Sequence, residues 1–208
     1  MEEREVVRKS DPEHRRQQLV EAATAVFIRQ GYANTRVADI AAAAGVAKGT
    51  VYEYFPSKEE VFLAVFAWVN EGITQRIEEE IAGAGDAVGR LETLFRVAGE
   101  IVAEHPNLYA MTLDFWAATR GTSVRDRLGK ACASLYEEHR RLISQILGEG
   151  CVSGQLRPEI DVDSIATVLV GALDGVGVQH FFDRSVDPRR AAAAFWHAIC
   201  GGLCVEQR

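Results

Sequence analysis

The sequence predicts an all-α protein of about nine helices, with a small N-terminal head and a larger helical body. Apolar residues recur at helical spacing along most of the 208 residues, and no segment alternates apolar and polar residues as a strand would. Ser, Asp and Pro stand where helices are expected to start, and Gly where they end. With 48% hydrophobic residues the chain can bury a core. We expect the head over residues 1–58, with a flexible arm over 1–12, and the body over 59–208.

The head is predicted to open with a helix from about 13 to 30, followed by two short helices joined by a tight turn. Gly45 supplies the left-handed backbone that ends the first short helix. The second directs Val51 and Phe55 inward and leaves a small polar face, centred on Gly49, outward. This pattern is typical of a helix-turn-helix that enters a major groove. An ordinary αα-hairpin is the alternative, but an outward Gly costs about 1 kcal/mol relative to Ala in a purely structural helix.

A third element of the head starts at Ser57, which forms a predicted capping box with Glu60. Lys58 follows the cap, where its charge opposes the helix dipole. A bound phosphate would turn this position into a DNA contact. The helix is expected to reach about Ile81, so that it belongs to the head at its start and to the body at its end.

Residues 13–66 contain a series of short motifs at fixed spacing: Thr35, Ile40-Ala41, Gly45-Val46, Ala47-Lys48-Gly49-Thr50-Val51-Tyr52, Tyr54-Phe55-Pro56 and Ser57-Lys58-Glu59. This segment resembles the DNA-binding signature of the tetracycline-repressor (TetR) family. Two positions depart from the family pattern: Ala47 replaces a usual Ser, and Ala38 stands where many members carry a polar or basic residue. The expected DNA-binding residues are Thr35, Arg36, Ala47, Lys48, Gly49, Thr50, Tyr52, Glu53, Tyr54 and Lys58. Glu53 either accepts from a cytosine amino group or is simply solvated.

The net charge of −7 belongs to the body. Residues 1–58 hold nine Lys/Arg and eight Asp/Glu, a net of +1, and the remainder holds 14 against 22, a net of −8. We therefore expect few, local phosphate contacts and a modest salt dependence for each head. The arm carries Arg4, Arg8 and Lys9, which lie near DNA in this interpretation, but its three Glu residues weaken any such contact.

In the body, Asp86 is expected to cap a helix that reaches His105, and further helices are expected over about 106–120, 124–147, 161–182 and 187–203. The glycines and Pro158 predict a loop over 148–160.

The last two predicted helices are apolar on more than one face, so both sides must be covered. The resemblance implies that they pair with their mates in a symmetric homodimer, which would present two heads to a palindromic operator. The expected interface residues are Leu169, Leu173, Val176, Phe195, Trp196 and Ile199. Burial within one chain is the alternative.

Aromatic residues recur at helical spacing after Pro106. Such a stripe is either plain core or, as the resemblance implies, the wall of a small-molecule site. The expected ligand-binding residues are Phe95, Tyr109, Met111, Thr112, Leu113, Phe115, Trp116 and Asp174. Aromatic rings with an acid such as Asp114 or Asp174 would suit a cation. Residues 114–128 and 154–161 weakly resemble choline-type (BetI-like) repressors, without naming a ligand.

The remaining features narrow the function. His197, Cys200 and Cys204 could share a helix face, as a thiol or metal sensor or as simple packing. No catalytic motif is present, so we expect neither an enzyme nor a cofactor or bound metal. The longest uncharged apolar stretch, 165–173, is too short to span a bilayer, and a cytoplasmic protein is expected. The sequence thus predicts a repressor that a small-molecule effector releases from double-stranded DNA; a DNA-binding regulator without such control is the alternative.

Overall fold

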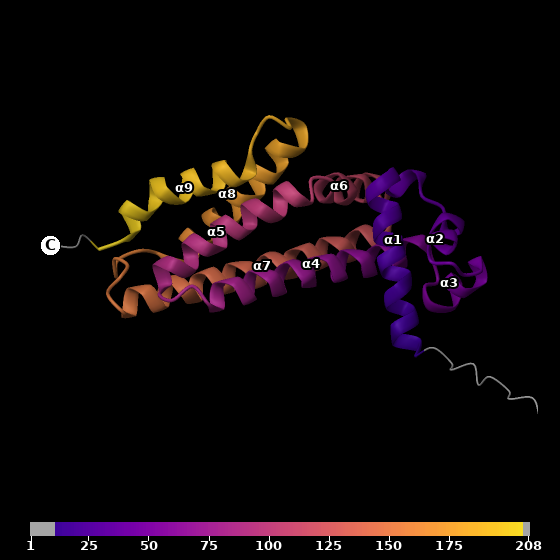
Figure 1. Ribbon diagram of the computed structural model, residues 1–208, viewed down its shortest axis with the longest axis horizontal. Coiled ribbons are helices and arrows are strands. Elements are labelled where there is room, and N and C mark those ends of the chain that lie inside the picture. The colour runs from indigo at the N-terminus through magenta and orange to yellow at the C-terminus, as the bar shows by residue number, and fades with distance from the viewer. Residues whose placement is uncertain (1–10, 206–208) are drawn as a thin grey trace, which may run out of the picture. The chain divides into compact units, whose positions relative to one another are not determined.

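The structure, a computed structural model, describes residues 11–205, and over this range it contains nine α-helices and no named strand (Figure 1). This confirms the predicted all-α fold. The helices are α1 (Pro12–Asn34), α2 (Val37–Ala43), α3 (Lys48–Tyr54), α4 (Lys58–Ala82), α5 (Ala87–Glu104), α6 (Leu108–Ala118), α7 (Ser123–Val152), α8 (Val162–Phe182) and α9 (Pro188–Leu203). Arg4, Arg8 and Lys9 of the expected arm lie outside the described residues, whereas Asp11 and Pro12 already belong to the start of α1.

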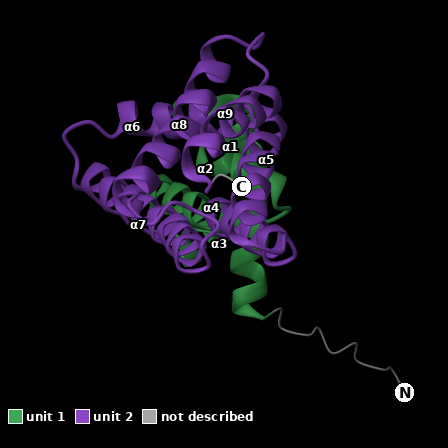
Figure 2. Cartoon of the chain, turned by 90° about the vertical axis from the view of Figure 1, so that its left-hand side faces the viewer, with its two compact units in different colours: residues 1–68 green, residues 69–208 purple. Residues whose placement is uncertain are grey.

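The chain divides into two compact units, the first ending at Trp68 and the second starting at Val69 (Figure 2). The division falls inside α4 and not at its first turn, where the sequence had suggested a boundary at residue 58. The helix is continuous through it, so α4 supplies residues to both units.

The core of the first unit is built on three aromatic rings. Phe27 and Tyr32 of α1 both meet Phe62 of α4 edge-on, with ring centroids 5.5 Å and 5.4 Å away. Edge-to-face packing of this kind adds about 0.5–1.5 kcal/mol per pair to the burial itself. Gly31, at φ 76°, provides the irregular turn within α1 that precedes Tyr32.

The second unit is organised around α5, which packs against α9, α7 and α8. Phe95 of α5 stacks on Trp196 of α9 at 5.6 Å with an interplanar angle of 21°. The two helices approach closely at Gly99, where an added Cβ would lie 3.1 Å from the Cβ of Ala192. A side chain at Gly99 would therefore force the pair apart.

Helix α7 is longer than predicted, because it continues through 148–152, which the sequence had suggested was a loop. Gly150 is helical and buried, and an added Cβ would lie 2.6 Å from Leu156 and 3.0 Å from Ala87. The glycine therefore serves close packing and does not break the helix. The prediction was wrong because sequence alone cannot distinguish these two uses of Gly.

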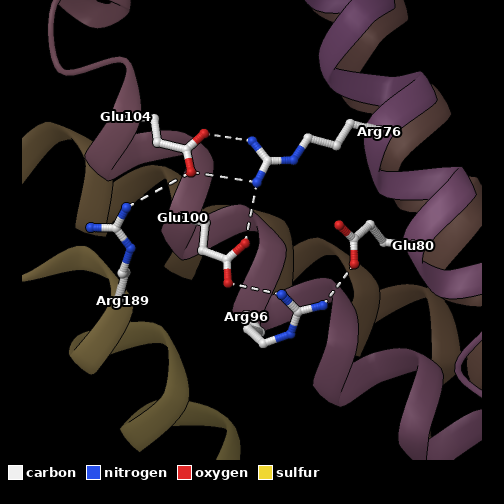
Figure 3. A network of polar contacts seen from close by, with 6 residues as sticks. All are labelled: Arg76, Glu80, Arg96, Glu100, Glu104 and Arg189. Carbon is white, nitrogen blue, oxygen red and sulfur yellow. Dashed lines mark hydrogen bonds and ion pairs between the residues drawn. The ribbon is translucent and has the colours of Figure 1, made fainter.

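Six charged residues connect α4, α5 and α9 within the second unit (Figure 3). Arg76 of α4 pairs with Glu104 at 2.6 Å and Glu100 at 3.2 Å, and Arg96 of α5 pairs with Glu100 at 2.8 Å. Two further pairs complete the set, Arg96–Glu80 at 2.9 Å and Arg189–Glu104 at 3.8 Å. Each pair is partly exposed and weak by itself, but together they hold the second half of α4 against α5.

Candidate DNA-binding and effector sites

The turn between α2 and α3 is fixed by backbone geometry. Gly45 has φ 67°, and Val46 N donates to Ala41 O at 3.0 Å. Val51 and Phe55 are buried, as expected for the inner side of α3. The motif is therefore a short helix held by its apolar side, with the opposite side turned to solvent.

The outward side of α3 carries most of the residues expected to bind DNA. Tyr52 is 46% exposed, and Lys48 Nζ lies 5.7 Å from the centre of its ring. An added Cβ at Gly49 would meet no atom within 4 Å, so the backbone itself is accessible there. Ala47, Lys48, Gly49, Tyr52, Glu53 and Arg36 are exposed, while Thr50 and Tyr54 are half-buried. This small face, with Lys48 and Tyr52 at its centre, has the shape and polarity that contact with bases and phosphates requires.

Two of the expected DNA contacts are instead used inside the protein. Lys58 Nζ donates to the carbonyl oxygens of Tyr32 and Thr35, at 2.9 Å each. The Thr35 side chain is buried, and its hydroxyl donates to Gly31 O at 2.6 Å. Both satisfy carbonyls left open at the end of α1, which accounts for their place in the sequence.

The expected cap of α4 is present. Ser57 Oγ accepts from Glu60 N at 3.3 Å, and the Tyr32 hydroxyl donates to Glu59 at 3.0 Å. Burial opposes ionisation of Glu59, but hydrogen bonds from its own backbone, Ser57 and Tyr32 outweigh it and lower the pKa of this carboxyl.

Sequence reasoning missed Arg16, whose guanidinium lies 5.0 Å from the centre of the Phe55 ring. Arg16 is exposed near the start of α1 and adds a positive charge beside the end of α3. The sequence offered one signal for this position: Arg16 lies three residues before Leu19 and seven before Ala23, on the same side of the helix.

A polar cluster in the second unit centres on Asp174 of α8, and we call Tyr109, Cys132, Tyr136, His139 and Asp174 the Asp174 cluster. The Tyr109 hydroxyl of α6 donates to Asp174 Oδ1 at 2.9 Å, and the Tyr136 hydroxyl of α7 also bonds to this carboxylate. Burial, reinforced by the charge of Asp174, raises the pKa of both tyrosines and of Cys132. Both hydroxyls therefore remain protonated donors at neutral pH.

His139 occupies the same face of α7. Its Nε2 is buried and has no hydrogen-bond partner. Burial lowers the pKa of the imidazole, against the opposing charges of Asp174 and Glu138. The sequence analysis missed Cys132, Tyr136 and His139, although their spacing of four and three residues places them on one helical face.

The other expected ligand residues do not all meet this cluster. Phe95, Met111 and Phe115 are buried, and Phe95 belongs to the main core. Thr112 donates its hydroxyl to Leu108 O at 3.1 Å, and Leu113 is 46% exposed. Trp116 is 37% exposed and lies 4.3 Å beneath the Arg125 guanidinium. Within the predicted set, a side-chain hydrogen bond joins Tyr109 of α6 to Asp174 of α8.

The expected dimer residues separate into two groups. Trp196 and Leu169 are buried within the core of their own chain. For these two residues the structure agrees with the alternative interpretation, burial within one chain. Leu173, Val176, Phe195 and Ile199 are half-buried. The uncovered apolar surface consists instead of Val168, Gly171, Val178 and Phe182 on α8 and Ala194, Ala198 and Gly201 on α9.

By length and composition α8 is apolar enough to cross a membrane, and within the described residues it alone passes that test. Only 22% of its apolar window is buried in the chain. A single such helix is weak support for a membrane span, and it equally fits a helix face that another protein covers.

The four cysteines lie on α7, on α9 and at its C-terminal cap. All four are unpaired, and Cys200 Sγ donates to His197 O at 3.4 Å. Burial, reinforced by the neighbouring Cys200, raises the pKa of the Cys204 thiol. Among residues 11–205, no group of three His, Cys, Asp or Glu side chains is arranged to hold a metal ion.

Comparison with known proteins matches both units. The family model described as bacterial regulatory proteins of the tetR family matches residues 19–65, and that of the C-terminal part of BetI-type transcriptional repressors matches 87–204. The fatty acid metabolism regulator protein of Bacillus subtilis is 27% identical over 157 residues, 76% of this chain and 78% of that protein. The repressor KstR2 of Mycobacterium tuberculosis is 27% identical over 155 residues, 73% and 74%. A TetR transcriptional regulator of Chloroflexus aurantiacus has a solved structure with a TM-score of 0.79 and 26% identity, covering 93% of this chain and 98% of that one.

Proposed function

The chain belongs to the tetR family of bacterial regulatory proteins, and from that premise we propose that it is a homodimeric repressor whose two α3 helices read a palindromic operator. Its function is that of a ligand-responsive, sequence-specific DNA-binding transcriptional regulator. The observation that carries the proposal is the outward face of α3, where Lys48, Gly49 and Tyr52 are exposed on a helix anchored by Val51 and Phe55.

A second copy of this chain is the proposed cover for the apolar surface of α8 and α9. Val168 is 62% and Phe182 77% exposed, and both lie on the α8 face that also carries Gly171. Small residues on α9, such as Ala198, would let the partner's helices approach closely. A dimer would read two half-sites at once, which multiplies sequence specificity. It would also double the number of phosphate contacts, of which a single head has few.

The relatives are regulators and not enzymes, and we extend this to the present chain. Binding to chromosomal DNA places the protein in the cytoplasm in this account. The name of one relative refers to fatty acid metabolism and the name of the other states no ligand, so these names do not define an effector for this chain.

The dimer is tested with Val168→Glu and Ala198→Glu, which place charges in the uncovered face. We expect monomers in analytical ultracentrifugation, with weakened operator binding and unchanged helix content. Ser134→Glu, at an exposed polar position on α7, is the control for an added carboxylate. A dimer that survives both apolar substitutions would move the interface elsewhere.

A further inference from the structure

We propose that the Asp174 cluster is the effector site and that the effector is a protonated primary or secondary amine. The inference rests on the proposed function, because it names the chemical class of the small molecule that controls DNA binding. It is carried by two features of the cluster, a carboxylate without a countercharge and a buried nitrogen without a partner.

The carboxylate of Asp174 is half-buried, and the side chains that bond to it within residues 11–205 are neutral. Tyr109 and Tyr136 donate hydroxyls to it, and the Cys132 thiol lies nearby. Over residues 11–205, no Lys or Arg forms an ion pair with this carboxylate. An ionised carboxylate can accept about four hydrogen bonds, so acceptor positions remain after the two tyrosines. A cation that brings N–H donors would satisfy both the charge and these positions.

His139 supplies the second open position. Burial keeps its ring neutral, and a neutral imidazole with a proton on Nδ1 presents Nε2 as an acceptor. A buried acceptor without a partner is unfavourable, so a ligand N–H that reaches it gains the bond without displacing another. Both open positions then call for a donor. A primary or secondary ammonium has at least two N–H groups, whereas a quaternary ammonium has none.

The surrounding residues suit such a guest. The Tyr109 ring lies against Gly177, where any added Cβ would overlap the ring, so this wall is fixed by α8 itself. The Tyr136 ring is 37% exposed and leaves a side from which the cluster can be reached. Two aromatic rings beside a cation add a further attraction that is strongest when water is excluded.

The proposal is tested by calorimetric titration of the full-length protein, in the absence of DNA, with three probes that share one carbon chain: butylammonium, butyltrimethylammonium and 1-butanol. We expect butylammonium to bind about tenfold or more tightly than either of the others, because a charge-assisted hydrogen bond is lost in each. Equal binding of the alcohol, tighter binding of the quaternary probe, or no binding of any probe would overturn the proposal.

Three variants locate the site. Asp174→Asn keeps the shape and an acceptor for Tyr109, and should weaken butylammonium binding about tenfold or more. Asp163→Asn is the matched control, since Asp163 also lies on α8 and accepts a hydrogen bond from the Ser144 hydroxyl at 2.9 Å.

His139→Phe should reduce the preference for butylammonium over the quaternary probe. This variant is expected to fold, because the substitution removes a buried nitrogen that has no hydrogen-bond partner. Unchanged preference in His139→Phe, or unchanged affinity in Asp174→Asn, would contradict the assignment.

Failure of this inference is distinguishable from failure of the proposed function. A protein that binds its operator but no amine remains a regulator with another effector, or one without small-molecule control. If the protein bound amines at Asp174 but did not bind DNA, the amine site would stand and the proposed role as a DNA-binding regulator would be wrong.

Discussion

The Lys58 ammonium lies 4.1 Å from the centre of the Tyr32 ring and donates to the Tyr32 carbonyl oxygen at 2.9 Å. The first residue of α4 thereby closes the end of α1. A positive charge is unfavourable at the start of its own helix but favourable at the C-terminal end of another, and here the second position is the one occupied. Lys58 therefore holds the two helices of the head together.

Replacing Lys58 with Met should lower the free energy of unfolding by about 2 kcal/mol, because carbonyls of Tyr32 and Thr35 lose a charged donor. Urea denaturation followed by circular dichroism measures this change. Lys48→Met, on the exposed face of α3, should leave stability within about 0.5 kcal/mol of wild type. If Lys58→Met kept full stability and lost only DNA affinity, the position would contact phosphate after all.

Replacing Tyr52 or Lys48 with Ala should weaken operator binding by about 1–3 kcal/mol, since contacts to bases or phosphate are lost. Fluorescence anisotropy with a labelled duplex gives the affinities. The Lys48 variant should also show a smaller salt dependence, because one counterion fewer is released. Glu59→Gln, which alters the inner Tyr32 contact, is a control for indirect effects on α3. Normal binding by both Ala variants would place the recognition face elsewhere.

The stability of the protein should fall as the pH is lowered below about 6.5, in part through His139. Burial lowers the pKa of this group in the folded state from its ordinary 6.5, so the unfolded chain binds the proton more readily below that value. Stability from this source is complete above pH 6.5 and is lost as the pH falls towards the folded pKa. Thermal unfolding between pH 5.5 and 7.5 should show a smaller slope in His139→Phe, and that variant should gain about 1 kcal/mol at neutral pH. An identical slope in the variant would exclude His139 as the cause.

Replacing Arg76 with Gln should cost at most about 1 kcal/mol of stability, because its pairs with Glu100 and Glu104 are partly exposed. The loss should fade at high salt as screening removes the interaction. Since Arg76 lies on α4, which continues into the head, the variant should also reduce the effect of the effector on operator affinity. Arg141→Gln, which breaks an exposed pair with Glu137 at 3.0 Å, is the matched control. Full effector response in Arg76→Gln would show that this ion pair does not transmit it.

The fold was largely predictable because its signals are local. Asp86 caps α5 through its side chain, as the sequence indicated, and Asp161 and Asp187 cap α8 and α9 in the same way. Gly45 ends the first helix of the motif with a positive φ, also as expected. The error at Gly150 arose because its role depends on Leu156 and Ala87, and the contact with Ala87 lies far along the chain.

The sites were less predictable because they depend on pairs of residues from different helices. Lys58 and Thr35 match a DNA-binding motif by spacing, but only the fold shows that their polar groups meet carbonyls of α1. Trp196 reads as one apolar residue of a two-sided helix until Phe95 is placed against it. Asp174 was predicted, whereas Tyr136 and His139 were not, since a polar cluster across α6, α7 and α8 leaves no contiguous motif.

The central claim is that a dimer of this chain reads a specific palindrome, and it is tested most directly by selecting bound sequences from a random duplex pool with the purified full-length protein. We expect recovery of a palindrome with half-sites about one helical turn apart, bound by two protomers. Tyr52→Ala should recover it weakly or not at all. Enrichment of no sequence by folded, dimeric, effector-free protein would contradict the account.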